Sequence, residues 1–135
     1  EKLQKLKEVY KDQYKSKILL RIKNELNKRG TIDVLRHQVK DYGVYLDLAY
    51  FKPVSKLNPE TLDLYNKNIL TIYRQVAYST KNNNTIDMLI CLNGLPIAVF
   101  ELKNQFTSQT VENGIKQFKK TRDSKELLFQ YEKRT

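Results

Sequence analysis

The N-terminal part of the chain has the apolar spacing of a long amphipathic helix. Over residues 2–29, apolar side chains recur at intervals close to 3.6, and Gly30 follows them as a stop signal. Residues 31–42 predict a second helix, with Thr31 as its N-cap and Gly43 as its terminator. The first third of the chain is therefore expected to be helical.

The middle of the chain changes to the patterns of β-strands and turns. Residues 44–51 alternate and predict a strand, and Asn58 followed by Pro59 predicts a short helix over about 60–67. Further along, apolar and β-branched runs predict three more strands, separated by a polar turn at 81–84 and by an Asn-Gly hairpin signal at 93–94. These strands are expected at 69–78, 85–92 and 95–103.

The C-terminal part returns to a helical pattern. Residues 111–121 predict a helix, and residues 126–131 predict the start of one more strand. The order of elements predicts an α/β fold with a mixed central β-sheet flanked by helices. We expect one domain over residues 1–135, helical over 1–67, with the catalytic sheet and helix over 68–135.

The composition narrows the class of protein. The chain has 25 Lys and Arg against 15 Asp and Glu, a net charge of +10 that favours binding to polyanions. Residues 1–30 hold ten basic and four acidic side chains and residues 111–135 hold seven basic and four acidic, so the positive surplus lies on the two flanks of the chain. One cysteine and one histidine exclude a disulfide framework, a multi-cysteine zinc site and a His-rich metal site. No apolar run is long enough to span a membrane, and we expect a cytoplasmic protein.

Charged residues interrupt two of the predicted apolar strands. Asp87 lies in the strand at 85–92, and Glu101 and Lys103 lie in the strand at 95–103. Burying one ionised group costs several kcal/mol, so such charges are expected to pair with one another or to bind a metal ion. Mg²⁺ prefers oxygen ligands and uses one or two carboxylates together with water and substrate phosphate.

Asp87 and Glu101 are therefore candidate metal ligands, and the backbone carbonyl of Leu102 is a candidate third ligand. Lys103 shares a strand face with Glu101, where its ammonium group could orient an attacking water and offset charge on a phosphate. The alternative is an ordinary salt bridge between Glu101 and Lys103, with Asp87 at a strand end.

The register of the Asn-Gly hairpin tests the metal-site hypothesis. A regular two-residue loop pairs Leu92 with Leu95, and it directs Asp87 away from Glu101 because side chains alternate between faces. The two carboxylates share a face only if the loop has three residues or if one strand contains a bulge. Pro96 donates no hydrogen bond to the ladder and suits an edge or bulge position.

A family resemblance accompanies these residues. Four stretches carry it, namely Ile-Tyr-Arg-Gln-Val at 72–76, Ile-Asp at 86–87, Leu-Asn-Gly-Leu-Pro-Ile at 92–97 and Phe-Glu-Leu-Lys-Asn at 100–104. Together they resemble the N-terminal nuclease domain of type I restriction enzyme R subunits, a member of the PD-(D/E)xK nuclease superfamily. The resemblance spans residues 58–130 well and the N-terminal helix loosely.

This resemblance implies Mg²⁺-dependent cleavage of double-stranded DNA, with Mn²⁺ as a possible substitute. It implies that Asp87 and Glu101 are metal ligands and that Lys103 is the catalytic lysine. A glutamine on the helix after the Glu-x-Lys strand supports activity or DNA contact in the family, and Gln117 matches it; Thr121 stands where some members have tyrosine. The implied setting is a bacterial restriction complex with methylation and specificity subunits as partners.

The resemblance also indicates what the chain does not contain. ATP is used by two motor domains that follow the nuclease domain in family members, and the chain has no G-x-x-x-x-G-K-[ST] motif. We expect the chain to be a fragment truncated at the C-terminus, so cleavage by the fragment alone is not assured. Two alternatives remain open, namely another PD-(D/E)xK resolvase or repair nuclease, and a non-catalytic module for DNA binding or subunit docking.

Overall fold

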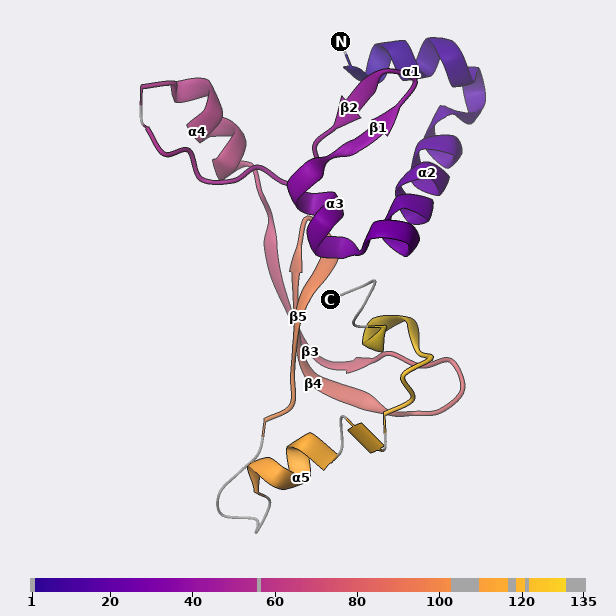
Figure 1. Cartoon of the computed structure of the whole chain (residues 1–135), viewed down its shortest axis with the longest axis vertical. Coiled ribbons are helices and arrows are strands. Elements are labelled where there is room, and N and C mark those ends of the chain that lie inside the picture. The colour runs from indigo at the N-terminus through magenta and orange to yellow at the C-terminus, as the bar shows by residue number, and fades with distance from the viewer. Residues whose placement is uncertain (1, 56, 103–109, 117–118, 121, 131–135) are drawn as a thin grey trace. The chain divides into compact units, whose positions relative to one another are not determined.

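The chain divides into two compact units, Glu1–Ile69 and Leu70–Thr135. A computed structural model of the chain describes residues 2–55, 57–102, 110–116, 119–120 and 122–130 (Figure 1). The mixture of helices and strands confirms the α/β class, but the predicted mixed sheet is wrong for the described residues, because their strand pairs are all antiparallel. The single domain and the C-terminal truncation stay predictions.

Unit 1 begins with a helical segment that is broken once. The predicted helix over 2–29 consists of α1 (Lys2–Tyr10), a single 3₁₀ turn η1 (Lys11–Gln13) and α2 (Tyr14–Arg29). The break falls where Lys11 adopts a φ of 50°, which a regular helix does not allow. Gly30 ends α2 as expected, and its N–H donates to the carbonyl of Leu26 at 3.0 Å.

The second helix is shorter than its pattern predicts. It is α3 (Thr31–His37), and it is followed by a small hairpin of β1 (Val39–Asp41) and β2 (Val44–Leu46). Tyr42 and Gly43 form the turn of this hairpin with φ values of 44° and 75°. The roles predicted for Gly43 as a helix terminator and Thr31 as an N-cap are therefore wrong, because the Tyr-Gly pair closes a hairpin and Gly30 precedes the helix.

The core of unit 1 lies between the helices and this hairpin. Leu6, Ile18 and Val44 are buried together, and the partly buried side chains packed against them are Tyr10, Tyr14, Ile22 and Leu46. The hairpin accordingly lies beside α1 and α2 in Figure 1. The hydroxyl of Tyr10 donates to the buried Asp41 carboxylate at 2.9 Å, and burial together with this bond raises the pKa of Tyr10 to about 12.

A short capped helix completes unit 1. It is α4 (Pro59–Asn66), and Asn58 caps it by accepting the N–H of Glu60 at 3.0 Å. This confirms the helix start predicted from the Asn-Pro pair. Asn68 follows the helix, and its side-chain carbonyl accepts the N–H of Tyr50 at 3.0 Å. None of the helices in the described part of the chain is long and apolar enough to cross a membrane.

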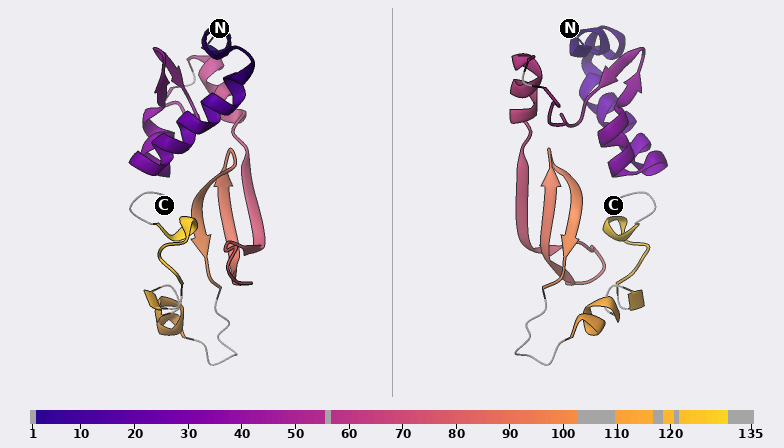
Figure 2. Two further views of the ribbon diagram at one scale, coloured as in Figure 1. Left: turned by 90° about the vertical axis from the view of Figure 1, so that its right-hand side faces the viewer. Right: turned by 60° about the vertical axis from the view of Figure 1, so that its left-hand side comes forward.

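Unit 2 is built on a three-stranded antiparallel sheet (Figure 2). Its strands are β3 (Leu70–Ala77), β4 (Thr85–Leu92) and β5 (Leu95–Phe100), with β4 in the centre. The three strands predicted from apolar runs are therefore confirmed. The last of them ends at Phe100, so Glu101 follows the strand instead of lying within it.

The β4–β5 hairpin combines a regular turn with a bulge. Asn93 and Gly94 form a two-residue loop with φ values of 50° and 83°, and Leu92 pairs with Leu95. The register then shifts by one, because Cys91 pairs with Pro96 while Ile90 pairs with Ala98. Ile97 is the extra residue of a β-bulge beside Pro96, which donates no ladder hydrogen bond.

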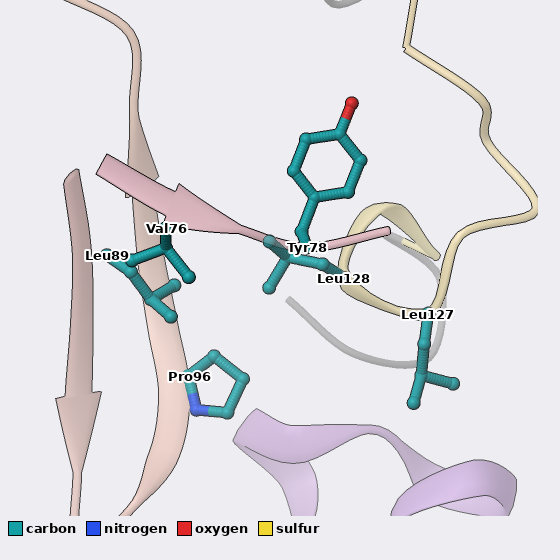
Figure 3. A pocket seen from close by; sticks show the side chains of 6 residues that line it. All are labelled: Val76, Tyr78, Leu89, Pro96, Leu127 and Leu128. Atoms are coloured by element: carbon teal, nitrogen blue, oxygen red, sulfur yellow. The ribbon is translucent and has the colours of Figure 1, made fainter. Parts of the chain in front are cut away.

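The C-terminal part of unit 2 consists of α5 (Val111–Lys116) and a 3₁₀ turn, η4 (Leu127–Phe129). The strand predicted over 126–131 is wrong for residues 127–129, because the N–H of Phe129 donates back to the carbonyl of Glu126 at 2.9 Å. The buried Phe129 ring packs edge-on against the Tyr78 ring, and the two ring centres are 4.7 Å apart. Leu127 and Leu128 line an apolar pocket (Figure 3) together with the sheet residues Val76, Leu89 and Pro96 and with Tyr78, which follows β3.

The Asn-Gly turn gives a test of the hairpin geometry. We expect Gly94→Ala to lower the free energy of unfolding by about 1 kcal/mol, because alanine is strained at positive φ. No atom lies within 4 Å of a Cβ built at this position, so crowding contributes nothing. Gly94→Asn is the matched control, since asparagine tolerates this conformation better. Equal losses for both variants in urea unfolding would contradict the turn geometry.

Candidate functional site

The register of the central hairpin determines which face of the sheet the two predicted acidic ligands would share. Beyond the bulge, Leu89 pairs with Val99 and Met88 pairs with Phe100. The ladder ends there, but continued by one residue it would set Asp87 opposite Glu101, and residues opposite each other in an antiparallel pair project to the same side. The bulge therefore meets the condition that the metal-site hypothesis set for this hairpin.

Two neutral donors hold the Asp87 carboxylate. Its Oδ1 accepts the side-chain amide of Gln75 at 3.1 Å, and its Oδ2 accepts the backbone N–H of Leu102 at 2.7 Å. Gln75 belongs to β3, whereas Leu102 follows β5, so a donor from one outer strand and a donor from the segment after the other meet at the central strand. Hydrogen bonds to a carboxylate are among the stronger ones in proteins, and these two restrict the orientation of Asp87.

Glu101 has a different kind of partner. Its Oε1 forms an ion pair with the guanidinium of Arg122, and the two side chains are only 5% and 6% exposed. The guanidinium charge of Arg122 compensates the buried carboxylate of Glu101, so the fold needs no metal ion for this purpose. The predicted salt bridge between Glu101 and Lys103 was the alternative to a metal site, and Arg122 provides such a bridge from another part of the chain.

Arg122 is anchored by further contacts within unit 2. It donates to the Tyr78 hydroxyl and to the Thr85 carbonyl, both at 2.8 Å, and its guanidinium carbon lies 5.1 Å from the centre of the Tyr78 ring. Burial opposes the charged form, but the Tyr78 bond and the Glu101 charge outweigh it and raise the pKa of Arg122. Its Nε atom is buried without a hydrogen-bond partner among the described residues.

The remaining predicted site residues are only partly described. Leu102 is 62% exposed, and its N–H rather than its carbonyl makes the contact with Asp87. Lys103, Gln117 and Thr121 lie outside the described residues. Within the described residues, no group of three or more His, Cys, Asp and Glu side chains is arranged to hold a metal ion. A metal ion at this site would need the carboxylates of Asp87 and Glu101, the Leu102 carbonyl, water and substrate as its ligands.

Arg122 and Tyr78 are site residues that the sequence pattern did not identify. Arg122 lies 21 positions beyond Glu101, in a segment where basic residues are frequent, so its sequence position carries no signal of a buried ion pair. Tyr78 was expected only as the last residue of an apolar strand. A basic residue between apolar segments is usually exposed, which is why this one was not recognised.

Comparison with known proteins identifies the family of the chain. Residues 1–133 match the family described as the type I restriction enzyme R protein N terminus. The chain belongs to this family. No curated protein and no solved structure matches the chain.

Membership of the type I restriction enzyme R protein family confirms the resemblance carried by the four sequence stretches. The match covers more of the chain than the resemblance did, because it includes unit 1 as well as residues 58–130. It connects the chain to a restriction enzyme subunit, and hence to a restriction system. The roles of individual residues stay predictions.

The buried ion pair leads to a stability prediction. We expect Arg122→Met to lower the free energy of unfolding by about 3–5 kcal/mol, because it leaves the buried Glu101 charge uncompensated. The double variant Arg122→Met/Glu101→Gln should lose less than the sum of the two single changes.

Urea unfolding of the four proteins in this cycle provides the measurement. Lys125→Met is the control, since it removes an exposed positive charge from the same segment. An Arg122→Met variant as stable as the Lys125→Met control would show that the ion pair is not buried as described.

Proposed function

We propose that the chain is the Mg²⁺-dependent DNA endonuclease domain of a type I restriction enzyme R subunit. It would hydrolyse phosphodiester bonds of double-stranded DNA and have the PD-(D/E)xK fold. The observation that supports this most directly is the bulged register, which pairs Met88 with Phe100 and, continued by one residue, would direct Asp87 and Glu101 to the same face. The family match favours this assignment over a resolvase or repair nuclease.

The side chains present fit a divalent cation in their donor chemistry. Asp87 offers carboxylate oxygens from β4 and Glu101 offers them from directly after β5, and the Leu102 carbonyl is close in sequence. Asp87 is bonded only to neutral donors in the described part of the chain, so its negative charge is available to a cation. When bound, Mg²⁺ or Mn²⁺ would polarise the phosphate and lower the pKa of a coordinated water.

The chain's own residues would then have separate tasks. Asp87 and Glu101 would hold the cation, and Lys103 would orient the attacking water and offset charge on the phosphate. Gln117 would support activity or contact DNA. Arg122 would either share Glu101 with the cation or withdraw from it, because its charge already compensates that carboxylate.

The unit 1 lysines provide a surface for DNA phosphates. Lys7, Lys11, Asp12, Tyr14 and Lys15 line an open hollow on this unit, and Lys7 lies 5.3 Å from the centre of the Tyr14 ring. Lys11 and Lys15 are exposed and have no carboxylate partner among the described residues. Such contacts would position the duplex without reading its sequence.

The proposed setting is a bacterial restriction complex in the cytoplasm. Methylation and specificity subunits would be the partners, and ATP would be used by motor domains outside this chain. DNA sequence recognition would belong to those other subunits.

One observation favours a second function, namely a non-catalytic module for DNA binding or subunit docking. The Glu101 charge is already compensated by Arg122, so the fold does not require a metal to tolerate this buried acid. A protein of this kind would bind DNA but would show no metal dependence at Asp87.

Metal binding and cleavage separate the two functions. We expect Asp87→Asn and Glu101→Gln each to reduce cleavage by the assembled complex by at least about 100-fold, equivalent to about 3 kcal/mol of transition-state stabilisation. Each should also weaken Mn²⁺ binding to the 135-residue chain in calorimetry. Asp123→Asn is the control, because it neutralises an exposed carboxylate of unit 2. Undiminished cleavage and Mn²⁺ binding in both variants would favour the non-catalytic module.

DNA binding by unit 1 is tested by its salt dependence. We expect Lys11→Gln/Lys15→Gln to reduce the slope of log K against log salt by about 2, since each phosphate contact contributes about 0.9. Lys2→Gln is the control, because Lys2 is already paired with Asp47 at 2.8 Å. Fluorescence anisotropy with a DNA duplex gives the slopes, and an identical slope in the double variant would exclude these lysines from the interface.

A further inference from the structure

A backbone irregularity lies directly beside the proposed site. Gln75 is an interior residue of β3 and has a φ of 50°, the left-handed conformation that non-glycine residues adopt rarely. Its strand neighbours Arg74 and Val76 pair normally with Met88 and Ile86, so the register continues across it. A conformation of this kind persists only where the surroundings stabilise it, and such outliers are concentrated at functional sites.

The same register places Gln75 opposite Asp87. The pairs on either side of this position leave Gln75 facing Asp87 across the β3–β4 ladder. The Gln75 Nε2 donates to Asp87 Oδ1 at 3.1 Å, and its Oε1 accepts from the Thr85 hydroxyl in a longer contact of 3.5 Å. The amide therefore has a donor on one side and an acceptor on the other, which fixes its orientation.

The two donors to Asp87 come from opposite sides of β4. Gln75 restrains Oδ1 from β3, while the Leu102 N–H restrains Oδ2 from the segment after β5. A neutral amide can orient a carboxylate without cancelling its charge. An arginine or lysine in the same place would compete with a cation for that charge, as Arg122 does at Glu101.

We propose that Gln75 is a positioning residue that orients the Asp87 carboxylate for a divalent cation. The inference rests on the proposed nuclease function, but it goes beyond it by assigning a role to a residue on another strand. Gln75 is not itself a ligand. Partners that orient metal ligands typically contribute about 10- to 100-fold to metal affinity.

Two variants at this position separate positioning from backbone strain. Gln75→Ala and Gln75→Gly both remove the amide, so both should weaken Mn²⁺ binding to the chain by about 10- to 100-fold. Only glycine accepts the positive φ without strain. The unfolding equilibrium constant of the alanine variant should therefore exceed that of the glycine variant by about fivefold.

Calorimetric titration with Mn²⁺ and urea unfolding give the two measurements. Arg74→Ala is the control, because Arg74 is exposed on the same strand and pairs with Met88. Equal losses of affinity in both Gln75 variants, with none in Arg74→Ala, would support the proposal. Wild-type affinity in Gln75→Gly would overturn it and would leave the nuclease function intact.

The failure of the nuclease function has a different signature. If the wild-type chain binds no Mn²⁺, or if Asp87→Asn does not change the affinity, the proposed metal site is wrong and the role of Gln75 fails with it. Comparison of Asp87→Asn with the two Gln75 variants therefore identifies which statement has failed.

Discussion

The one-residue shift in the β4–β5 ladder is the constraint on which the candidate site depends. The Asn-Gly turn alone would pair Asp87 with Phe100 and would turn Glu101 to the other face of the sheet. The bulge at Ile97 corrects this register within the hairpin. Because the side-chain period of a strand is two, a single extra residue is sufficient to convert an arrangement that excludes a shared site into one that permits it.

A second irregularity lies across the sheet from the first. β5 carries the bulge and β3 carries the left-handed Gln75, while β4 between them runs regularly from Thr85 to Leu92. Bulges and irregular residues are tolerated best in outer strands, where they bend the chain and redirect side chains. The two outer strands thus deviate at different points along β4, which itself is regular: β3 deviates opposite Asp87, and β5 deviates opposite Ile90 and Cys91.

Much of this fold could be predicted from local sequence signals. Gly30, the Asn58–Pro59 pair and the Asn93–Gly94 turn each act through their own backbone conformation, and each was found where expected. The small hairpin of β1 and β2 was missed because its turn, Tyr42 and Gly43, also resembles the end of a helix. In that case a local signal had two interpretations, and the packing of the hairpin on the helices decided between them.

The site was less predictable, for reasons that differ between residues. The sequence indicates that a three-residue loop or a bulge is necessary, but the residues around the bulge are apolar on both faces, so no polar alternation marks Ile97 as the extra residue. The partner of Glu101 could not be inferred, because Arg122 is brought to it by folding over a separation of 21 residues. Long-range ion pairs of this kind leave no periodic pattern in the sequence.

The two acidic residues also differ in how the fold accommodates their charge. Asp87 is half-buried and accepts neutral N–H groups, whereas Glu101 is buried and is paired with a guanidinium. A divalent cation between them would gain the full attraction of Asp87, but at Glu101 it would repel the charge of Arg122. Like charges repel more strongly in a dry interior than in water. Keeping both the cation and the guanidinium close to this carboxylate would therefore cost free energy. The affinity of such a site for a metal would therefore be limited at Glu101, and the orientation of Asp87 would have a correspondingly larger influence on it.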